Sequence, residues 1–259
     1  MRLTFLGTGT SFGIPQIGCD CAVCQSTDPR DRRTRSGAVL QARGSTLLID
    51  TPPELRLQLL RARISQVDAV LYTHEHADHV NGIDDLRVFS VKQRRPLACH
   101  GPADSLERIR SNFRYIFDDE VQVYEGTTKP RLELSPVEHG VERVIAGIPV
   151  LPLAFEHGHI RVFGYRFGPV AYLTDVKAVP EEARKQLGGL KLLVLNALWW
   201  RTHPTHLSIG EAVETAQAIG AEQTLLTHLT HETGHAELAG QLPPGIGPAY
   251  DGLTIEVRE

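Results

Sequence analysis

Four side chains that commonly bind metals crowd into one short stretch that directly follows an apolar run: His74, His76, Asp78 and His79. Imidazoles and a carboxylate this close together are costly to desolvate unless a cation binds them. Imidazole is also the commonest metal ligand in proteins. The spacing therefore predicts a metal site, and the alternative, a solvated polar loop, is not typical of such tracts. If a helix begins near Ala77, the last two of these side chains point away from the first two, and one segment can serve two metals.

A second group of ligands lies near the N-terminus, where Cys19, Cys21 and Cys24 form a Cys-x-Cys-x-x-Cys pattern. Three thiols this close together indicate a metal site and not a disulfide framework. A tetrahedral structural zinc needs a fourth ligand, and we expect it to be His231. The alternative, three unliganded thiols, would invite oxidation. This site would make residues 13–36 a zinc-binding loop.

Other histidines and an aspartate occur at the ends of apolar stretches, namely His157, Asp175 and His228. Strands are expected before the histidine-rich stretch and before each of these residues, at residues 67–72, 150–155, 170–173 and 224–226. A strand end on a rigid scaffold is a place where a ligand can be aimed accurately. Each of these positions could therefore hold a ligand, but it is the family resemblance given below that selects these three residues.

Strands and helices alternate along the chain, which indicates α/β layering. A hairpin is expected around Arg43-Gly44, and such short connections favour mixed sheets. One helix is expected to open at Pro52-Pro53 and to run to about Ala62, because proline suits a first helical turn. Another should begin after Ser208, with Glu211 completing a capping box. No shift in composition marks a boundary, so we predict a single domain over residues 1–259.

The composition excludes several classes of protein. Hydrophobic residues make up 41% of the 259 residues and charged residues 22%, which is typical of a globular chain. The formal net charge is −4, so the bulk surface is a poor partner for nucleic acid. No segment approaches the ~18 apolar residues of a membrane span, and the apolar run at the start is too short for a secretory signal. We therefore predict a cytoplasmic location without membrane association.

The His-x-His-x-Asp-His pattern of residues 74–79 resembles the hallmark of the metallo-β-lactamase superfamily. The resemblance implies an αββα sandwich, in which two mixed β-sheets lie face to face and helices cover the outer faces. It also implies a dinuclear site of divalent metals, zinc or manganese, at the sheet edge, since His and Asp ligands suit both. By that resemblance, the first metal is held by His74, His76 and His157, the second by Asp78, His79 and His228, and Asp175 bridges them.

The same resemblance gives a role to Asp50 and decides between His157 and His159. Asp50 follows an expected strand, like the superfamily's early aspartate that hydrogen-bonds a ligand imidazole; the alternative is a surface turn. His157 is preferred to His159 as the ligand because Gly158 follows it, as in the superfamily. We expect His159 to be a wet loop or pocket residue, and Glu75 to be a spacer that faces solvent.

Together with this motif, the cysteine cluster is similar to that of the PhnP-like phosphodiesterases, in which a Cys3His zinc site lies beside the dinuclear centre. Residues 6–11 and 249–252 also resemble that family. The implied activity is hydrolysis of a small, cyclic phosphodiester, such as 5-phosphoribosyl 1,2-cyclic phosphate, by a hydroxide that two metals activate. The implied catalytic residues are Asp78 and His206, the latter as general acid or hydrogen-bond donor, with His203 as the alternative. The family also suggests a homodimer.

Two other kinds of function are kept open. An RNase Z-like nuclease or a lactonase would use the same metals, although the chain has no long Gly/Pro-rich insertion to grip tRNA. A PqqB-like accessory protein would bind a small molecule without hydrolysing it.

Two further stretches have more than one possible role. Arg30 to Arg35 could form an arginine fork for phosphate or a solvated loop. Trp199-Trp200 could line the pocket, an interface or the core.

Overall fold

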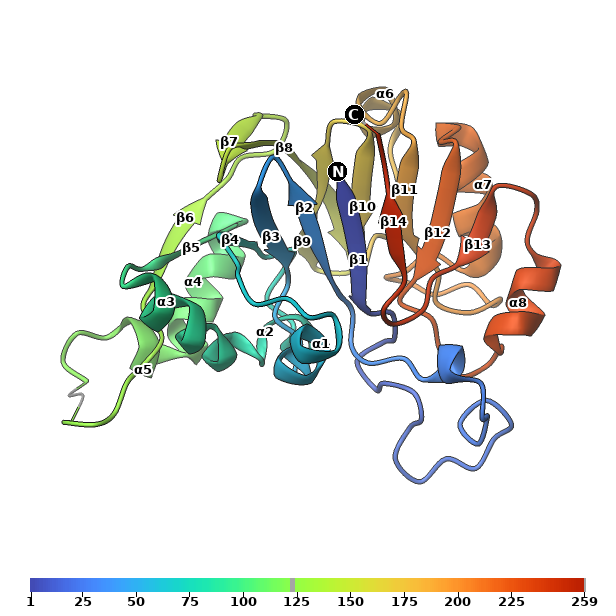
Figure 1. The fold of residues 1–259 in the computed structure, drawn as a ribbon. Helices are drawn as coiled ribbons and strands as arrows, with labels where there is room; N and C mark the ends of the chain where they lie inside the picture. The colour runs from blue at the N-terminus through green and yellow to red at the C-terminus, as the bar shows by residue number, and fades with distance from the viewer. Residues whose placement is uncertain (122–123, 259) are drawn as a thin grey trace.

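Two seven-stranded mixed sheets lie face to face in the computed structural model, which describes residues 1–121 and 124–258 (Figure 1). The first sheet has an antiparallel half that contains both ends of the chain, because β1 pairs with β14 and β2. From β3 to β6 its strands are parallel. In sheet order, its strands are β14 (Thr254–Glu256), β1 (Arg2–Gly7), β2 (Gly37–Ala42), β3 (Ser45–Ile49), β4 (Ala69–Leu71), β5 (Leu97–Gly101) and β6 (Leu132–Pro136).

The second sheet combines a parallel half with three consecutive antiparallel hairpins. Strands β10 to β13 run parallel, so their carboxyl ends meet at one edge. Strands β7 to β10 are antiparallel neighbours. In sheet order, its strands are β13 (Ile246–Pro248), β12 (Gln223–Thr227), β11 (Leu192–Asn196), β10 (Val170–Leu173), β9 (Ile160–Phe167), β8 (Ile148–His157) and β7 (Arg143–Ile145).

Three apolar layers hold the sandwich together. Side chains such as Phe5 and Tyr165 fill the space between the sheets. One group of helices packs its apolar side chains on the outer face of the first sheet, and another group covers the second sheet (Figure 1). These are α1 (Leu55–Arg61), α2 (Ala77–Val80), α3 (Arg87–Gln93), α4 (Ala103–Asn112) and α5 (Arg114–Phe117), followed by α6 (Glu181–Gln186), α7 (Ile209–Ile219) and α8 (His235–Gln241). The αββα sandwich with mixed sheets is confirmed.

Local signals in the sequence mostly mark the true boundaries. The capping box of Ser208 and Glu211 begins α7, as predicted, and the turn at Arg43-Gly44 joins β2 to β3. The helix expected at Pro52 begins later, at Leu55. The Pro52 carbonyl instead accepts a turn hydrogen bond from the Leu55 amide, so the two prolines precede the helix. Within the described ranges, no helix is both long and apolar enough to cross a membrane.

Candidate metal centres

Loops at the ends of several strands bring the ligand-type side chains together. The histidine-rich segment leaves β4 and turns into α2 at Ala77, as the spacing predicts. His157 ends β8, whereas Asp175 and His228 lie just beyond β10 and β12. The last two have left-handed backbones, with φ of +59° and +57°. Such a conformation costs a non-glycine residue about 1–3 kcal/mol, and here it turns each side chain sharply at its strand end.

Four groups of three potential ligand atoms form at this edge, each within 4.8 Å; two of them match the predicted ligand sets, and the other two include Asp175. The first matching group contains His74, His76 and His157, and the second contains Asp78, His79 and His228. Asp175 lies between them. Its Oδ2 atom is 3.7 Å from His74 Nε2 and 3.4 Å from His79 Nε2, and its Oδ1 atom is 3.4 Å from His228 Nε2. The two predicted ligand sets therefore meet at Asp175, which forms one group with His74 and His79.

The donor set fits divalent cations. The Nε2 atoms of His74, His79 and His228 are buried and have no hydrogen-bond partner. Buried polar atoms without a partner are costly in proteins, and here several of them face carboxylate oxygens at one point. Imidazole nitrogens and carboxylate oxygens are the usual ligands of zinc and of similar metals. A bound cation would satisfy all of these groups at once.

The pKa shifts of the clustered side chains also favour a bound cation. Burial opposes protonation of His79, yet the carboxylates of Asp175, Asp78 and Asp50 raise its pKa well above the usual value. Burial likewise would raise the pKa of Asp175, but the histidines around it hold this pKa well below its usual range. Burial lowers the pKa of His74, which favours the neutral imidazole that a metal requires. The Asp175 carboxylate therefore stays ionised and needs a counter-charge.

Asp50 supports the cluster from behind, as expected. The carboxylate is fully buried and lies 2.7 Å from His79 Nδ1. It also accepts hydrogen bonds from the amide and the hydroxyl of Thr73, both at 2.8 Å. These contacts hold the proton of His79 on Nδ1 and leave Nε2 facing the cluster.

Asp50→Asn should therefore weaken metal binding, since its amide group turns N–H donors toward groups that also donate. We expect the affinity to fall by about 10–100-fold, the usual cost of losing such a supporting group. Competition with a chromogenic chelator measures it. Asp84→Asn changes an aspartate outside the site, and its affinity should match that of the wild type. Unchanged affinity in Asp50→Asn would show that the contact does not orient His79.

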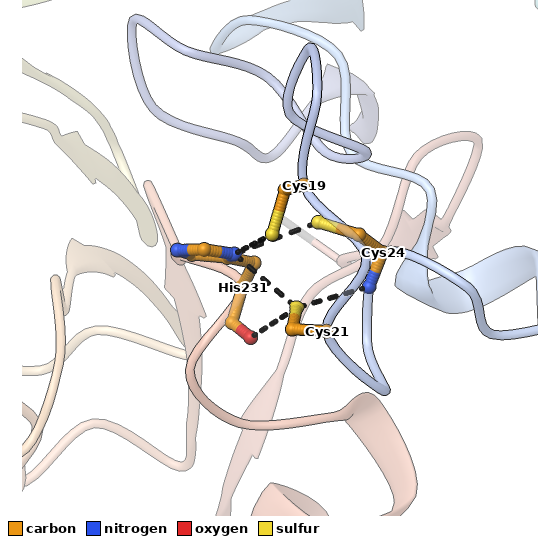
Figure 2. A group of neighbouring side chains, drawn as sticks. All are labelled: Cys19, Cys21, Cys24 and His231. Carbon is orange, nitrogen blue, oxygen red and sulfur yellow. Dashed lines mark hydrogen bonds between the residues drawn. The ribbon is translucent and has the colours of Figure 1, made fainter.

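The cysteine loop forms a second centre with His231 (Figure 2). The His231 Nδ1 atom lies 3.3 Å from the Sγ atoms of Cys19 and Cys21 and 3.5 Å from that of Cys24. The Cys24 amide donates to Cys21 Sγ, and this bond lowers the Cys21 pKa to about 6, whereas burial raises the Cys24 pKa to about 11. Three thiols and one imidazole that converge in this way suit a tetrahedral zinc.

A buried arginine fastens this loop to the end of β12. The Arg33 side chain is 0% exposed. It donates to the carbonyls of Thr230 and Thr233 and pairs with Asp31. Arg35 pairs with Glu54 instead. Both interpretations of the arginine run, a phosphate fork and a solvated loop, are therefore wrong for Arg33, because its guanidinium is used inside the protein.

Cys21→Ser should remove one zinc per chain and lower the melting temperature, because metal binding contributes to the stability of a loop that it closes. Elemental analysis and thermal unfolding measure the two effects. Cys99→Ala changes a buried cysteine outside the loop and should keep the full metal content. Equal zinc content in wild type and Cys21→Ser would contradict a metal at this centre.

A pocket of about 490 Å³ opens above the two groups of ligands. His206 lines it, with Nε2 at 3.4 Å from Asp175 Oδ2 and Nδ1 at 2.9 Å from the Thr205 hydroxyl. Gly158 allows this approach, since a Cβ atom there would lie 2.9 Å from Thr205 Cγ2. The pocket is lined by Ser11, His76, Asp78, His157, Gly158, His159, Ile160, Asp175, Thr205, His206 and His228. Neither tryptophan and none of the arginines from residue 30 to 35 is in this lining.

Sequence reasoning missed some residues at the site. Glu75 does not face solvent: its side chain is 11% exposed, pairs with Arg108 at 3.2 Å and accepts a hydrogen bond from Ser105. The expectation was wrong because α4 packs over this loop. Ser11 brings a hydroxyl into the pocket from the start of the cysteine loop. No local signal marked either residue, since both contacts depend on distant segments.

The sequence matches known proteins over most of its length. Residues 45–229 match the beta-lactamase superfamily domain. A Porphyromonas gingivalis protein named octanoyltransferase is 40% identical over all of this chain, which spans only 52% of that protein's length. Coenzyme PQQ synthesis protein B of Methylobacterium nodulans is 30% identical, with 76% of this chain and 72% of that protein aligned.

Solved structures show the same architecture. A diphosphatase from the PhnP family superposes with a TM-score of 0.91 and 39% identity, over 99% of this chain and 98% of its own. Zinc-bound PqqB from Methylobacterium extorquens superposes with a TM-score of 0.80, over 99% of this chain and 100% of its own. Its identity is 18%, so that likeness concerns the fold alone.

Proposed function

This chain belongs to the metallo-β-lactamase superfamily, and from that membership we propose that it is a metal-dependent phosphodiesterase. Its substrate would be a small, cyclic phosphodiester such as 5-phosphoribosyl 1,2-cyclic phosphate. The observation that carries the proposal is the complete set of ligands around Asp175 at the floor of an open pocket. The 39% identity to a diphosphatase of the PhnP family supports chemistry at phosphorus.

The two groups of ligands would each hold one divalent cation, and Asp175 would contact both. Zinc and manganese both suit these ligands. When bound, such a pair neutralises phosphoryl oxygens and supplies a nucleophilic water at neutral pH. A structural zinc would occupy the cysteine centre. We therefore expect three metal ions per chain.

His206 would hold the proton that the leaving oxygen needs. Burial lowers the pKa of His206, whereas the nearby Asp175 carboxylate favours the imidazolium and opposes this shift. The imidazolium is the form that can protonate a leaving alkoxide. In the imidazolium, Nδ1 would donate to the Thr205 hydroxyl, 2.9 Å away. Nε2, the atom nearest Asp175, would carry the proton that is transferred. The side chain is 12% exposed. That burial excludes most water from the proton that is transferred.

Hydrolysis of bis(p-nitrophenyl) phosphate tests the proposal. We expect turnover with added Mn²⁺ or Zn²⁺ and loss of turnover with a chelator, because the ligand set alone provides no strong nucleophile. Re-addition of metal should restore the activity. Absence of chelator-sensitive turnover with any phosphodiester, in protein that contains its metals, would overturn the proposed function.

One alternative has specific support. The 30% identity to coenzyme PQQ synthesis protein B favours an accessory protein that binds a small molecule. Tight binding without turnover would indicate that function, whereas the full ligand set favours hydrolysis.

The octanoyltransferase name applies to a relative about half of which lies outside the match. The residues that line the pocket include neither cysteine nor lysine as a nucleophile for an acyl group.

A further inference from the structure

A second pocket of about 370 Å³ adjoins the metal pocket. His159 and Ile160, at the turn between β8 and β9, line both pockets. The other walls of the second pocket come from the start of α4 and from residues 137–139. A diester whose phosphorus lies over the metal ligands can therefore extend across this hairpin turn into the second pocket.

The second pocket carries groups of both charges. Asp104 and Glu138 present carboxylates, and Arg108 and Arg161 present guanidinium groups. Glu75, also part of the lining, pairs with Arg108, and most of the Arg108 side chain remains exposed, at 66%. These groups offer both hydrogen-bond donors and acceptors to a ligand.

Apolar and ring side chains complete this surface. Phe163 and Val137 are buried beneath it. His139 accepts a hydrogen bond from the Ala154 amide at Nδ1, which fixes its proton on Nε2. The imidazole of His159 is exposed between the two pockets. A flat, partly apolar group can pack against such rings while its polar atoms bond to the charged rim.

The balance of charge selects the class of ligand. Three carboxylates face two guanidinium groups, so the pocket offers no surplus of positive charge to a second phosphate. A phosphate on the 5-position of a bound sugar would therefore have to lie outside the pocket, in solvent. A cationic ligand would be repelled by the two arginine guanidinium groups. An uncharged group with several hydroxyls matches the mixture, because each hydroxyl both donates and accepts. We propose that the second pocket binds the sugar portion of the phosphodiester and so determines specificity. This inference rests on the proposed function of the neighbouring metal site.

Two cyclic diesters with the same ring test this proposal: ribose 1,2-cyclic phosphate and ethylene glycol cyclic phosphate, which lacks the sugar. The readout is the ratio of their kcat/KM values, followed by phosphorus NMR. We expect Glu138→Gln and Arg161→Ala each to lower this ratio about tenfold, as is typical when a hydrogen bond to a charged group is lost. Glu142→Gln, an exposed glutamate outside the pocket, should keep the wild-type ratio. A ratio that stays constant in both pocket variants would overturn the proposal.

Ligand-observed NMR separates failure of this proposal from failure of the proposed function. Saturation transfer from the protein to the ribose protons should be clear in the wild type and weaker in Glu138→Gln. Sugar binding without hydrolysis of either diester would support the pocket and reject the phosphodiesterase. Hydrolysis of both diesters without saturation of the ribose protons would support the phosphodiesterase and reject the pocket.

Discussion

Asp175→Ala should remove the catalytic metals and the activity together. The carboxylate lies 3.4 to 3.7 Å from the Nε2 atoms of His74, His79 and His228, so it is the one acid shared by both groups of ligands. Without it, clustered imidazoles would have to bind two cations with one negative charge fewer. We expect turnover of bis(p-nitrophenyl) phosphate to fall by about 10³-fold or more, the scale of losing a main electrostatic contribution.

Elemental analysis distinguishes this result from simple unfolding. The variant should retain about one zinc per chain, at the cysteine centre, while losing the other metals. Asp84→Ala replaces a half-buried aspartate outside the site, which pairs with Arg87, and should keep wild-type metal content and rate. An Asp175→Ala protein that kept a full metal complement and near-normal turnover would end the assignment of this residue as the shared ligand.

His206→Asn should have a different signature, in which metals remain and the rate falls. A positioned proton donor contributes about 10²–10⁴-fold, so we expect a loss of this size for a diester with an alkoxide leaving group. The loss should be much smaller for bis(p-nitrophenyl) phosphate, because p-nitrophenolate leaves without protonation. The readouts are kcat for the two substrates and the metal content.

The comparison between leaving groups makes this prediction specific. An equal loss for both substrates would show that His206 acts in binding or as a ligand, since its Nε2 atom also belongs to a group of potential ligand atoms with His157 and Asp175. Loss of metal in His206→Asn would give the same conclusion. Retention of metal with a strong dependence on the leaving group is the outcome that we expect.

Dense local patterns made much of this site predictable. The histidine-rich segment predicts metal ligands because burying its imidazoles and carboxylate without a cation costs free energy. Asp175 and His228 are selected by the order of ligands in the superfamily that the sequence resembles, and both follow short apolar strands, as that order requires. His231 is 207 residues from Cys24, and its pairing with the cysteines rested on tetrahedral coordination together with a family resemblance.

Contacts between distant segments were beyond the reach of these patterns. The second pocket exists because α4 and residues 137–139 lie beside the β8–β9 turn, and no periodicity in the sequence encodes that approach. Arg33 looked like part of a charged run, whereas its burial depends on two carbonyls near residue 230. The left-handed backbones of Asp175 and His228 likewise arise from strand geometry, which residue type does not reveal.

The closeness of His228 and His231 restricts how this protein can be redesigned. One short segment contributes to both metal centres, and Arg33 clamps its carbonyls. An insertion or a change of length there would disturb both centres simultaneously. In the second pocket, Glu75 lies between two metal ligands, and His159 and Ile160 also line the metal pocket, but residues such as Asp104, Glu138 and Arg161 belong to neither metal centre. Libraries intended to alter substrate choice should therefore diversify these last residues and leave residues 228–233 untouched.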